Sequence, residues 1–433
     1  MSSYWCELAW LGGSQAESGV LISVDGERIE SVSAGVAPPG DAERLHGLTL
    51  PGLANAHSHA FQRALRGRTQ GGSGSFWTWR EQMYTLAGTI DPDSYLALAR
   101  ATFGEMALAG VTAVGEFHYL HHGPGGVPYD DPNAMGRAVM QAAAEAGVRI
   151  TLIDACYLRG GFGEELDEVQ KRFADEDVEA WVSRVDALPA PAAAIHSVRA
   201  VDPESARVVA EWAARRDAPL HAHVSEQPAE NEGSLAAHGR SPTGVLAGAG
   251  ALSERFTAVH ATHLTDVDIE MLGDAGVTCC FCPTTERDLA DGIGPARRLR
   301  EAGARLALGS DSHAVIDPFE EARAVELDER LATRVRGSHS AVDLLPAATA
   351  DGYRCLGLPE GGRLEAGALA DVVTVGLDSV RLAGTDPSSA LESVVFAGTA
   401  ADVKHVMVGG RFIVRDGAHV DLDVPRELAS VMP

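Results

Sequence analysis

Eight short apolar runs, separated by long segments rich in Ala, Leu and Glu, are the feature of this sequence that most restricts its fold. Apolar runs that alternate with segments of helical period are typical of β-strands and α-helices built around a parallel sheet. Eight such units predict an α/β chain with a TIM-like (β/α)8 barrel, whose active site lies at the carboxyl ends of the strands. The runs are LTLPGLANAH (around 49–58), GVTAVGEF (110–117), VRITLIDAC (148–156), AAAIHS (192–197), APLHAHV (218–224), FTAVHAT (256–262), VTCCFC (277–282) and ARLALGSD (304–311).

The two ends of the chain have a different pattern, with short alternating runs and many turn residues. Near the start, Asp25-Gly26 stands between two such runs, which predicts a β-hairpin. After residue 358 the segment SVVFAGTAADVKHVMVGGRFIVRDGAH is again β in character. We therefore expect residues 1–48 and 359–433 to form one small β-sandwich domain, and residues 49–358 to form the catalytic barrel.

The charge balance limits the partners of the chain. Lys and Arg number 35 against 61 Asp and Glu, a formal net charge of -26, which repels phosphate backbones and anionic membrane surfaces. The N-terminus lacks a basic signal-peptide start, and no run of eighteen uncharged apolar residues occurs. These features predict a cytoplasmic protein that binds neither nucleic acid nor membranes. In so acidic a chain, an Arg that lines a pocket indicates an acidic ligand.

The six cysteines are not spaced as a disulfide framework or a zinc ribbon. Cys280 and Cys282 fall in an apolar run that reads as a buried strand, so we interpret them as core residues. The others are Cys6, Cys156, Cys279 and Cys355.

Histidines and a carboxylate end four of the eight predicted strands. The first run ends in Asn55-Ala-His57-Ser-His59, and because side chains alternate across a strand, both imidazoles point to the same side. The residues that end the other three runs are His221, His223 and Glu226 in the fifth, His260 in the sixth, and Asp311 with His313 in the eighth. Such a set predicts a divalent metal site of the zinc type, with room left for water.

Each of these histidines taken alone has a simpler interpretation. A structural role is the better reading for His221, His263 and His313 considered singly. It does not explain why polar residues stand together at the ends of strands one, five, six and eight.

The motifs PGLANAHSH, HAHVSEQ, VHATH and LGSDSH resemble, in order, those of the amidohydrolase superfamily, and the resemblance spans nearly the whole chain. It implies that His57, His59, His223 and Asp311 bind the metal. It also implies that His260 contacts the metal-bound water or the substrate and that Glu226 shuttles protons. The fourth run ends in His196, where binuclear members have a Lys, so one metal ion is expected, zinc or alternatively Fe²⁺.

This metal site fits hydrolytic deamination. A divalent ion lowers the pKa of its bound water from about 15.7 to near 7, which gives hydroxide at neutral pH. Asp311 can hold the proton of that water. Ammonia then leaves an amidine carbon only if its nitrogen is protonated by a positioned acid, for which Glu226 is placed.

Further stretches, HAFQRALRGRT, SFWTWREQMY, GEFHYLHH, IHSVRAV and CPTTERDLADGI, are similar to the formimidoylglutamate deiminases. This resemblance implies hydrolysis of N-formimidoyl-L-glutamate to N-formyl-L-glutamate and ammonia in histidine degradation. Two guanidiniums, those of Arg80 and Arg199, suit the two carboxylates of that substrate. The residues implied to line the substrate pocket are Gln62, Arg80, Tyr119, His196 and Arg199.

Other interpretations stay open at this point. From composition alone, a surface salt bridge explains each Arg as well as substrate binding does. Trp77 and Trp79 read as core or lid residues, and His118, His121 and His122 read as loop residues without metal partners.

Two other functions also remain. The chain could be a deaminase of a nucleobase such as guanine, or of a triazine, in which case the pocket needs aromatic stacking rather than two Arg. It could also be an inactive barrel used as a scaffold, although all six metal and proton-transfer residues are present. A homodimer is expected by analogy alone.

Overall fold

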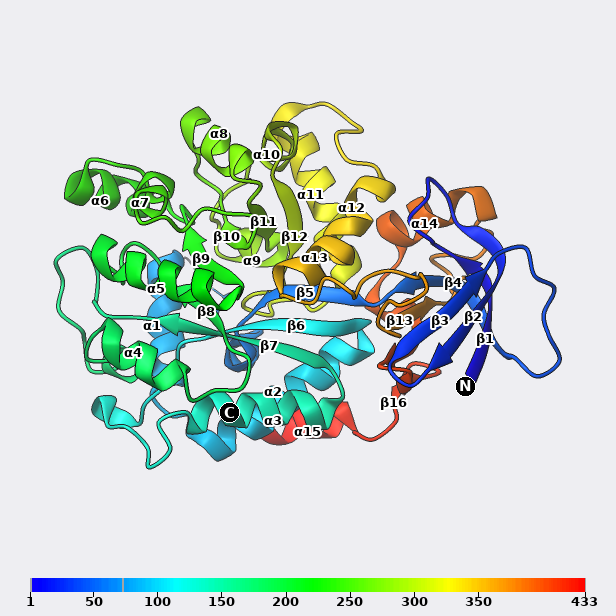
Figure 1. Ribbon diagram of the computed structural model, residues 1–433, viewed down its shortest axis with the longest axis horizontal. Coiled ribbons are helices and arrows are strands. Elements are labelled where there is room, and N and C mark those ends of the chain that lie inside the picture. The colour runs from blue at the N-terminus through cyan, green and yellow to red at the C-terminus, as the bar shows by residue number, and fades with distance from the viewer. Residues whose placement is uncertain (1, 72–73, 433) are drawn as a thin grey trace.

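The computed structural model describes residues 2–71 and 74–432, and it consists of two eight-stranded sheets with helices around one of them (Figure 1). One sheet is parallel throughout and nearly closed, and the other joins the two ends of the chain. The predicted TIM-like barrel with a separate β unit from both chain ends is thereby confirmed.

The barrel contains all eight predicted strands in sequence order. They are buried along almost their whole length, as expected of parallel strands covered on both faces, which explains their unbroken apolar runs. The first and last strands meet at their carboxyl ends, where the backbone N–H of His59 donates to the carbonyl of Asp311 (3.1 Å) and that of Asp311 to the carbonyl of His57 (3.0 Å). The strands are β5 (Leu53–Ser58), β6 (Val111–His118), β7 (Arg149–Cys156), β8 (Ala192–Ile195), β9 (Leu220–Val224), β10 (Phe256–His260), β11 (Thr278–Phe281) and β12 (Arg305–Leu308).

One or more helices follow each strand and cover the outside of the barrel (Figure 1). Several of them begin at an Asp followed by Pro, where the carboxylate accepts free N–H groups of the first turn; Asp202 and Asp317 are examples. The helices are α1 (Phe76–Ala87), α2 (Pro92–Leu108), α3 (Ala134–Ala146), α4 (Val178–Val185), α5 (Pro203–Arg216), α6 (Pro228–His238), α7 (Pro242–Gly248), α8 (Asp266–Asp274), α9 (Pro283–Asp288), α10 (Ala296–Ala302), α11 (Pro318–Thr333), α12 (Ala341–Ala348) and α13 (Ala350–Cys355).

The second sheet has the order β16-β15-β14-β13-β4-β1-β2-β3, so that β4 joins the strands from the two ends of the chain. Strand β4 is parallel to β1 and antiparallel to β13. The predicted hairpin is present, because Asp25 pairs with Arg28 across a turn in which Gly26 has φ 56°. The strands are β1 (Ser2–Ala9), β2 (Glu17–Asp25), β3 (Arg28–Ser33), β4 (Glu43–Pro51), β13 (Val372–Val375), β14 (Val403–Val408), β15 (Arg411–Arg415) and β16 (Ala418–His419).

Two helices interrupt the β pattern expected after residue 358. The segment SVVFA belongs to α14 (Ala390–Ala397), so its assignment to a strand is wrong. Leu391, Val394 and Val395 are buried at helical spacing, which a five-residue apolar run viewed alone does not reveal. The last helix, α15 (Val424–Val431), lies beside α2 of the barrel (Figure 1).

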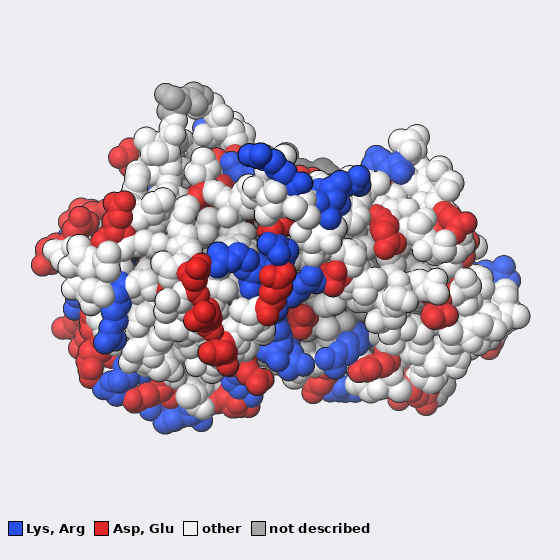
Figure 2. Space-filling model, turned by 90° about the horizontal axis from the view of Figure 1, so that it is seen from above, with Lys and Arg blue, Asp and Glu red and all other residues white. Residues whose placement is uncertain are grey.

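The charged residues do not gather into one basic surface on the face that Figure 2 presents, where acidic and basic side chains are interleaved. Within residues 2–71 and 74–432, no helix combines the length and apolarity needed to cross a membrane.

Candidate active site

The site forms where the carboxyl ends of the barrel strands meet. Several residues there adopt the left-handed backbone region that non-glycine residues rarely occupy, among them His260 (φ 67°) and Asp311 (φ 43°). Strain of this kind persists only where the surrounding structure holds it, and it concentrates at functional sites.

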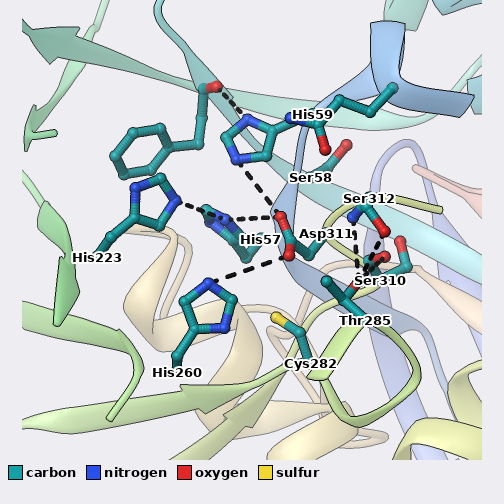
Figure 3. A network of polar contacts seen from close by, with 12 residues as sticks. His57, Ser58, His59, His223, His260, Cys282, Thr285, Ser310, Asp311 and Ser312 are labelled. Atoms are coloured by element: carbon teal, nitrogen blue, oxygen red, sulfur yellow. Dashed lines mark hydrogen bonds and ion pairs between the residues drawn. The ribbon is translucent and has the colours of Figure 1, made fainter. Parts of the chain in front are cut away.

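Three imidazoles and one carboxylate converge at this point (Figure 3). Oδ1 of Asp311 lies 3.3 Å from Nε2 of His57 and 3.4 Å from Nε2 of His59. Nε2 of His223, on β9, lies 3.2 Å from Nε2 of His57. The structure therefore brings together all four residues that the sequence predicted as metal ligands.

These distances suit one tetrahedral ion. With zinc–ligand bonds of about 2.0–2.1 Å, neighbouring ligand atoms lie about 3.4 Å apart. Burial lowers the pKa of His57 and His223, and it lowers that of His59 to about 3, so the imidazoles are neutral, as metal ligands must be. The carbonyl of Phe117 lies 2.8 Å from Nδ1 of His59 and can accept its proton, which leaves Nε2 free to bind the ion.

His260 and Glu226 lie on the open side of this cluster. Nε2 of His260 is 3.7 Å from Oε1 of Glu226 and 4.0 Å from Oδ2 of Asp311. Burial alone would lower the pKa of His260, but the nearby carboxylates, Glu226 foremost, raise it well above its usual value. Burial raises the pKa of Glu226, partly offset by the positive charges of His260 and Arg199, which suits a carboxyl group that exchanges protons near neutral pH.

A cavity of about 390 Å³ opens directly onto the cluster. Its wall includes His59, His223 and Asp311 as well as Glu226 and His260. All five residues predicted to contact substrate also line it: Gln62, Arg80, Tyr119, His196 and Arg199.

The two arginines have few partners of their own. Nη2 of Arg199 is 3.7 Å from Oε2 of Glu226, and its buried Nε has no hydrogen-bond partner. Arg80 lies over the rings of Trp77 (4.7 Å) and Tyr84 (5.4 Å), and it makes no ion pair within the described part of the chain. Both guanidiniums therefore retain hydrogen-bonding capacity toward an anion in the cavity.

Much of the remaining wall is aromatic, which the sequence did not reveal. Trp77 and Trp79, read there as core or lid residues, lie on α1 and line the cavity. Phe76, Tyr84, Tyr157 and Phe173 also contribute. Phe76, Trp77, Trp79 and Tyr84 come from the one helix α1, within the stretch SFWTWREQMY, whereas Tyr157 and Phe173 reach the cavity from distant segments that no local motif connects with it.

Glu230 is a further carboxyl group in the cavity wall, and its short distance from Glu226 in the sequence could have pointed to it. It stands one helical turn after Glu226, and its Oε2 accepts the backbone N–H of Glu226 (3.2 Å). Burial raises its pKa to about 7, and its Oε1 has no hydrogen-bond partner.

The remaining histidines near the strand ends contact backbone carbonyls or serine side chains. Nε2 of His221 lies 3.0 Å from the carbonyl of Cys355, and Nε2 of His263 lies 2.7 Å from that of Asp291. His313 lies between Ser58 (3.1 Å) and Ser310 (2.9 Å).

His121 and His122 lie in the loop after β6, as expected, whereas His118 does not and belongs to the strand itself. His118 ends β6, and all three are buried. They adjoin a charged network in which Arg184 pairs with Asp154 (2.7 Å) and Asp175 (2.8 Å).

Replacing Arg184 by Met is expected to lower the free energy of unfolding by about 3–5 kcal/mol, because two buried carboxylates lose their partner. Urea unfolding measures the loss. The matched control is Arg216→Met, whose exposed pair with Asp186 should contribute less than about 1 kcal/mol. Equal losses in the two variants would contradict this account of the network.

Comparison with known families agrees with the fold and the site. Residues 48–413 match the model of the amidohydrolase family, and the chain therefore belongs to that family. Among curated relatives, it is 37% identical to the formimidoylglutamate deiminase of Pseudomonas aeruginosa over 92% of this chain and 91% of the relative. It is also 31% identical to the 8-oxoguanine deaminase of the same organism, over 95% of this chain and 93% of the relative.

Solved structures give the same result. An amidohydrolase from Brucella melitensis superimposes with a TM-score of 0.92 at 33% identity, covering 100% of this chain and 99% of the other. A variant of an atrazine chlorohydrolase from Arthrobacter aurescens, crystallised with zinc and atraton, superimposes with a TM-score of 0.88 at 25% identity over the whole of both chains.

Proposed function

We propose that this chain is a metal-dependent deaminase that hydrolyses N-formimidoyl-L-glutamate to N-formyl-L-glutamate and ammonia, a reaction of histidine degradation. The observation that carries the proposal is that Arg80 and Arg199 line the same cavity as His59, His223 and Asp311 of the His57–His59–His223–Asp311 cluster. The identity to a formimidoylglutamate deiminase over nearly the whole chain supports the same substrate.

The cluster would hold one divalent ion, zinc being the first candidate because a structural relative was crystallised with it. When bound, such an ion supplies Lewis-acid activation of water near neutral pH. The structure offers four protein ligands with suitable spacing, and the adjoining cavity gives access to substrate and water.

The residues around the cluster can perform the proton transfers. Glu226 accepts a proton from the attacking water and donates it to the departing nitrogen, so that the C–N bond breaks and ammonia leaves. His260, held in its charged form by the surrounding carboxylates, stabilises negative charge on the oxygen that adds to the amidine carbon. The =NH nitrogen needs two protons to leave as ammonia, and the second one passes from the remaining O–H of the added water through Asp311 to that nitrogen.

Arg80 and Arg199 would each bind one carboxylate of the substrate. Removing the Arg80 guanidinium is informative because no protein carboxylate depends on it in the described residues. We expect Arg80→Met to raise KM for N-formimidoyl-L-glutamate by about tenfold to a hundredfold, the value of a hydrogen-bonded charge pair of about 1.5–3 kcal/mol. Steady-state kinetics measure the change, and the exposed Arg215→Met on α5 serves as the control.

A truncated substrate separates this binding role from a structural one. N-formimidoylglycine lacks one carboxylate, and with it the wild type should show a raised KM. If Arg80 binds the missing group, Arg80→Met should raise KM for the truncated substrate little further. Equal penalties for N-formimidoylglycine and also for N-formimidoyl-4-aminobutyrate, which lacks the other carboxylate, would instead show that Arg80 acts on the shape of the cavity.

The aromatic wall favours one alternative, deamination of a flat ring such as a nucleobase. Trp77, Trp79 and Tyr84 supply surfaces on which a ring could stack. The 8-oxoguanine deaminase among the relatives makes that substrate class the first comparison. A ring substrate would leave the two guanidiniums without anionic partners, which is why we rank it second.

A further inference from the structure

Cys282 lies beside the metal cluster but has no part in the proposed reaction. It follows β11, is fully buried, and is seen in Figure 3 beside the ring of His260 and below Asp311. Together with His260 and Glu286 it forms a second group of donor atoms that lie within 4.8 Å of one another. From the sequence alone, this cysteine was expected only to be part of the core.

The two nitrogens of His260 face two different groups. Nε2 is directed toward Glu226 and Asp311, whereas Nδ1 lies 3.4 Å from Oε1 of Glu286. Glu286 is itself fixed, because its Oε1 accepts the backbone N–H of Cys282 (2.9 Å). In a tetrahedral zinc site, sulfur and nitrogen ligands lie about 3.6 Å apart, so a small inward shift brings these donors onto one ion.

Several acidic side chains surround this group, and burial raises the pKa of Glu226 and raises that of Asp291 to about 9, so both can give up a proton when a cation binds nearby. Glu226, Glu286, Asp291 and Asp311 are all buried here, with His260 and Arg199 as the nearby positive groups. Oδ2 of Asp291 is buried without a hydrogen-bond partner. A further positive charge near Glu286 would therefore be favoured electrostatically.

We propose that His260, Cys282 and Glu286 form a second, inhibitory site for a thiophilic divalent ion such as Zn²⁺, Cd²⁺ or Co²⁺. The thiolate and imidazole ligands exclude Mg²⁺ and Ca²⁺, which take oxygen ligands. Binding forms a bond from the ion to the Cys282 sulfur and releases the thiol proton to solvent. This site rests on the proposed function only in that the His57–His59–His223–Asp311 cluster takes up the first ion.

Occupation of this site would stop the reaction through His260. An ion bound at Nδ1 draws the imidazole ring toward Cys282 and Glu286, so that Nε2 leaves its present place beside Glu226 and Asp311 at the cavity. The enzyme would then be active with one equivalent of zinc and inhibited by a second.

Metal binding tests the inference without reference to turnover. Protein carrying one equivalent of zinc is titrated with Co²⁺, and both the bound metal and the near-ultraviolet absorption of a cobalt–thiolate bond are measured. Wild type should bind one further equivalent with that absorption. Cys282→Ser, which nearly preserves the volume, should show no such absorption, whereas Cys6→Ser, which removes a buried thiol of the second sheet, should bind as wild type does.

The activity assay then gives the consequence. A second equivalent of Zn²⁺ should lower the wild-type rate at least tenfold, and Cys282→Ser should retain most of its own rate under the same conditions. The inference is overturned if no second equivalent binds at tenfold molar excess, or if binding occurs without thiolate absorption. If the protein binds the second metal ion as described but does not deaminate N-formimidoyl-L-glutamate, the proposed function is contradicted and the second metal site is not.

Discussion

Replacing Glu226 by Gln is expected to lower kcat for deamination by about a hundredfold to ten-thousandfold while the metal stays bound. The amide occupies nearly the same volume but can neither accept a proton from water nor give one to the leaving nitrogen, and general acid–base catalysis contributes about that factor. KM should change little. Steady-state kinetics on the metal-loaded variant, with metal content determined on the same sample, measure the effect.

The control for this variant is Glu232→Gln, an exposed carboxyl group on α6, the helix that begins two residues after Glu226. It removes one negative charge near the site without touching the cavity lining and should keep wild-type activity. Full activity in Glu226→Gln would exclude Glu226 as the proton-transfer group.

Replacing Asp311 by Asn is expected to abolish activity by a different route, through the metal. Asp311 Oδ1 faces the Nε2 atoms of both His57 and His59, and an amide is a weaker ligand for a divalent ion than a carboxylate. Metal affinity should fall by at least about a hundredfold, since changes to groups outside the ligand set already cost ten- to a hundredfold. Equilibrium dialysis against zinc measures the affinity.

Asp266→Asn, an exposed change on α8, is the matched control and should bind zinc as the wild type does. Because the backbone of Asp311 also closes the barrel, circular dichroism should confirm that the Asn variant folds. A folded Asn variant with undiminished zinc affinity would show that Asp311 is not a ligand.

The barrel could be predicted from sequence because its signal is local. Each parallel strand is buried on both faces and therefore appears as a continuous apolar run, as in AAAI of β8 and TCCF of β11. The segment SVVFA shows the limit of this argument. This segment is as apolar as a strand, yet it is helical. The sequence did not reveal the helix, because the helical spacing of its buried residues becomes evident only when the preceding residues are included.

The metal cluster was also within reach of the sequence. His57 and His59 lie two residues apart on one strand, and the ends of parallel strands must meet at one end of a barrel. The aromatic wall of the cavity could not be predicted from the sequence. Its residues, such as Trp77 on α1, Tyr157 after β7 and Phe173, approach one another only through tertiary packing.

The contacts of Glu286 and the buried network around His118 could not be predicted from the sequence either, because they too form only through tertiary packing. Their partners, among them Arg184, come from distant segments, so that no spacing rule connects them. The cytoplasmic location and the homodimer stay predictions.

The central claim is that the cavity selects a dianionic, linear amidine. It is tested most directly by adding N-formimidoyl-L-glutamate to wild-type protein that carries one equivalent of zinc, and by measuring ammonia and N-formyl-L-glutamate. Guanine, 8-oxoguanine and formamide are run in parallel. The account predicts rapid release from N-formimidoyl-L-glutamate alone, with the two products in equal amounts. No release from it with zinc confirmed bound, or faster release from a nucleobase, would contradict the account.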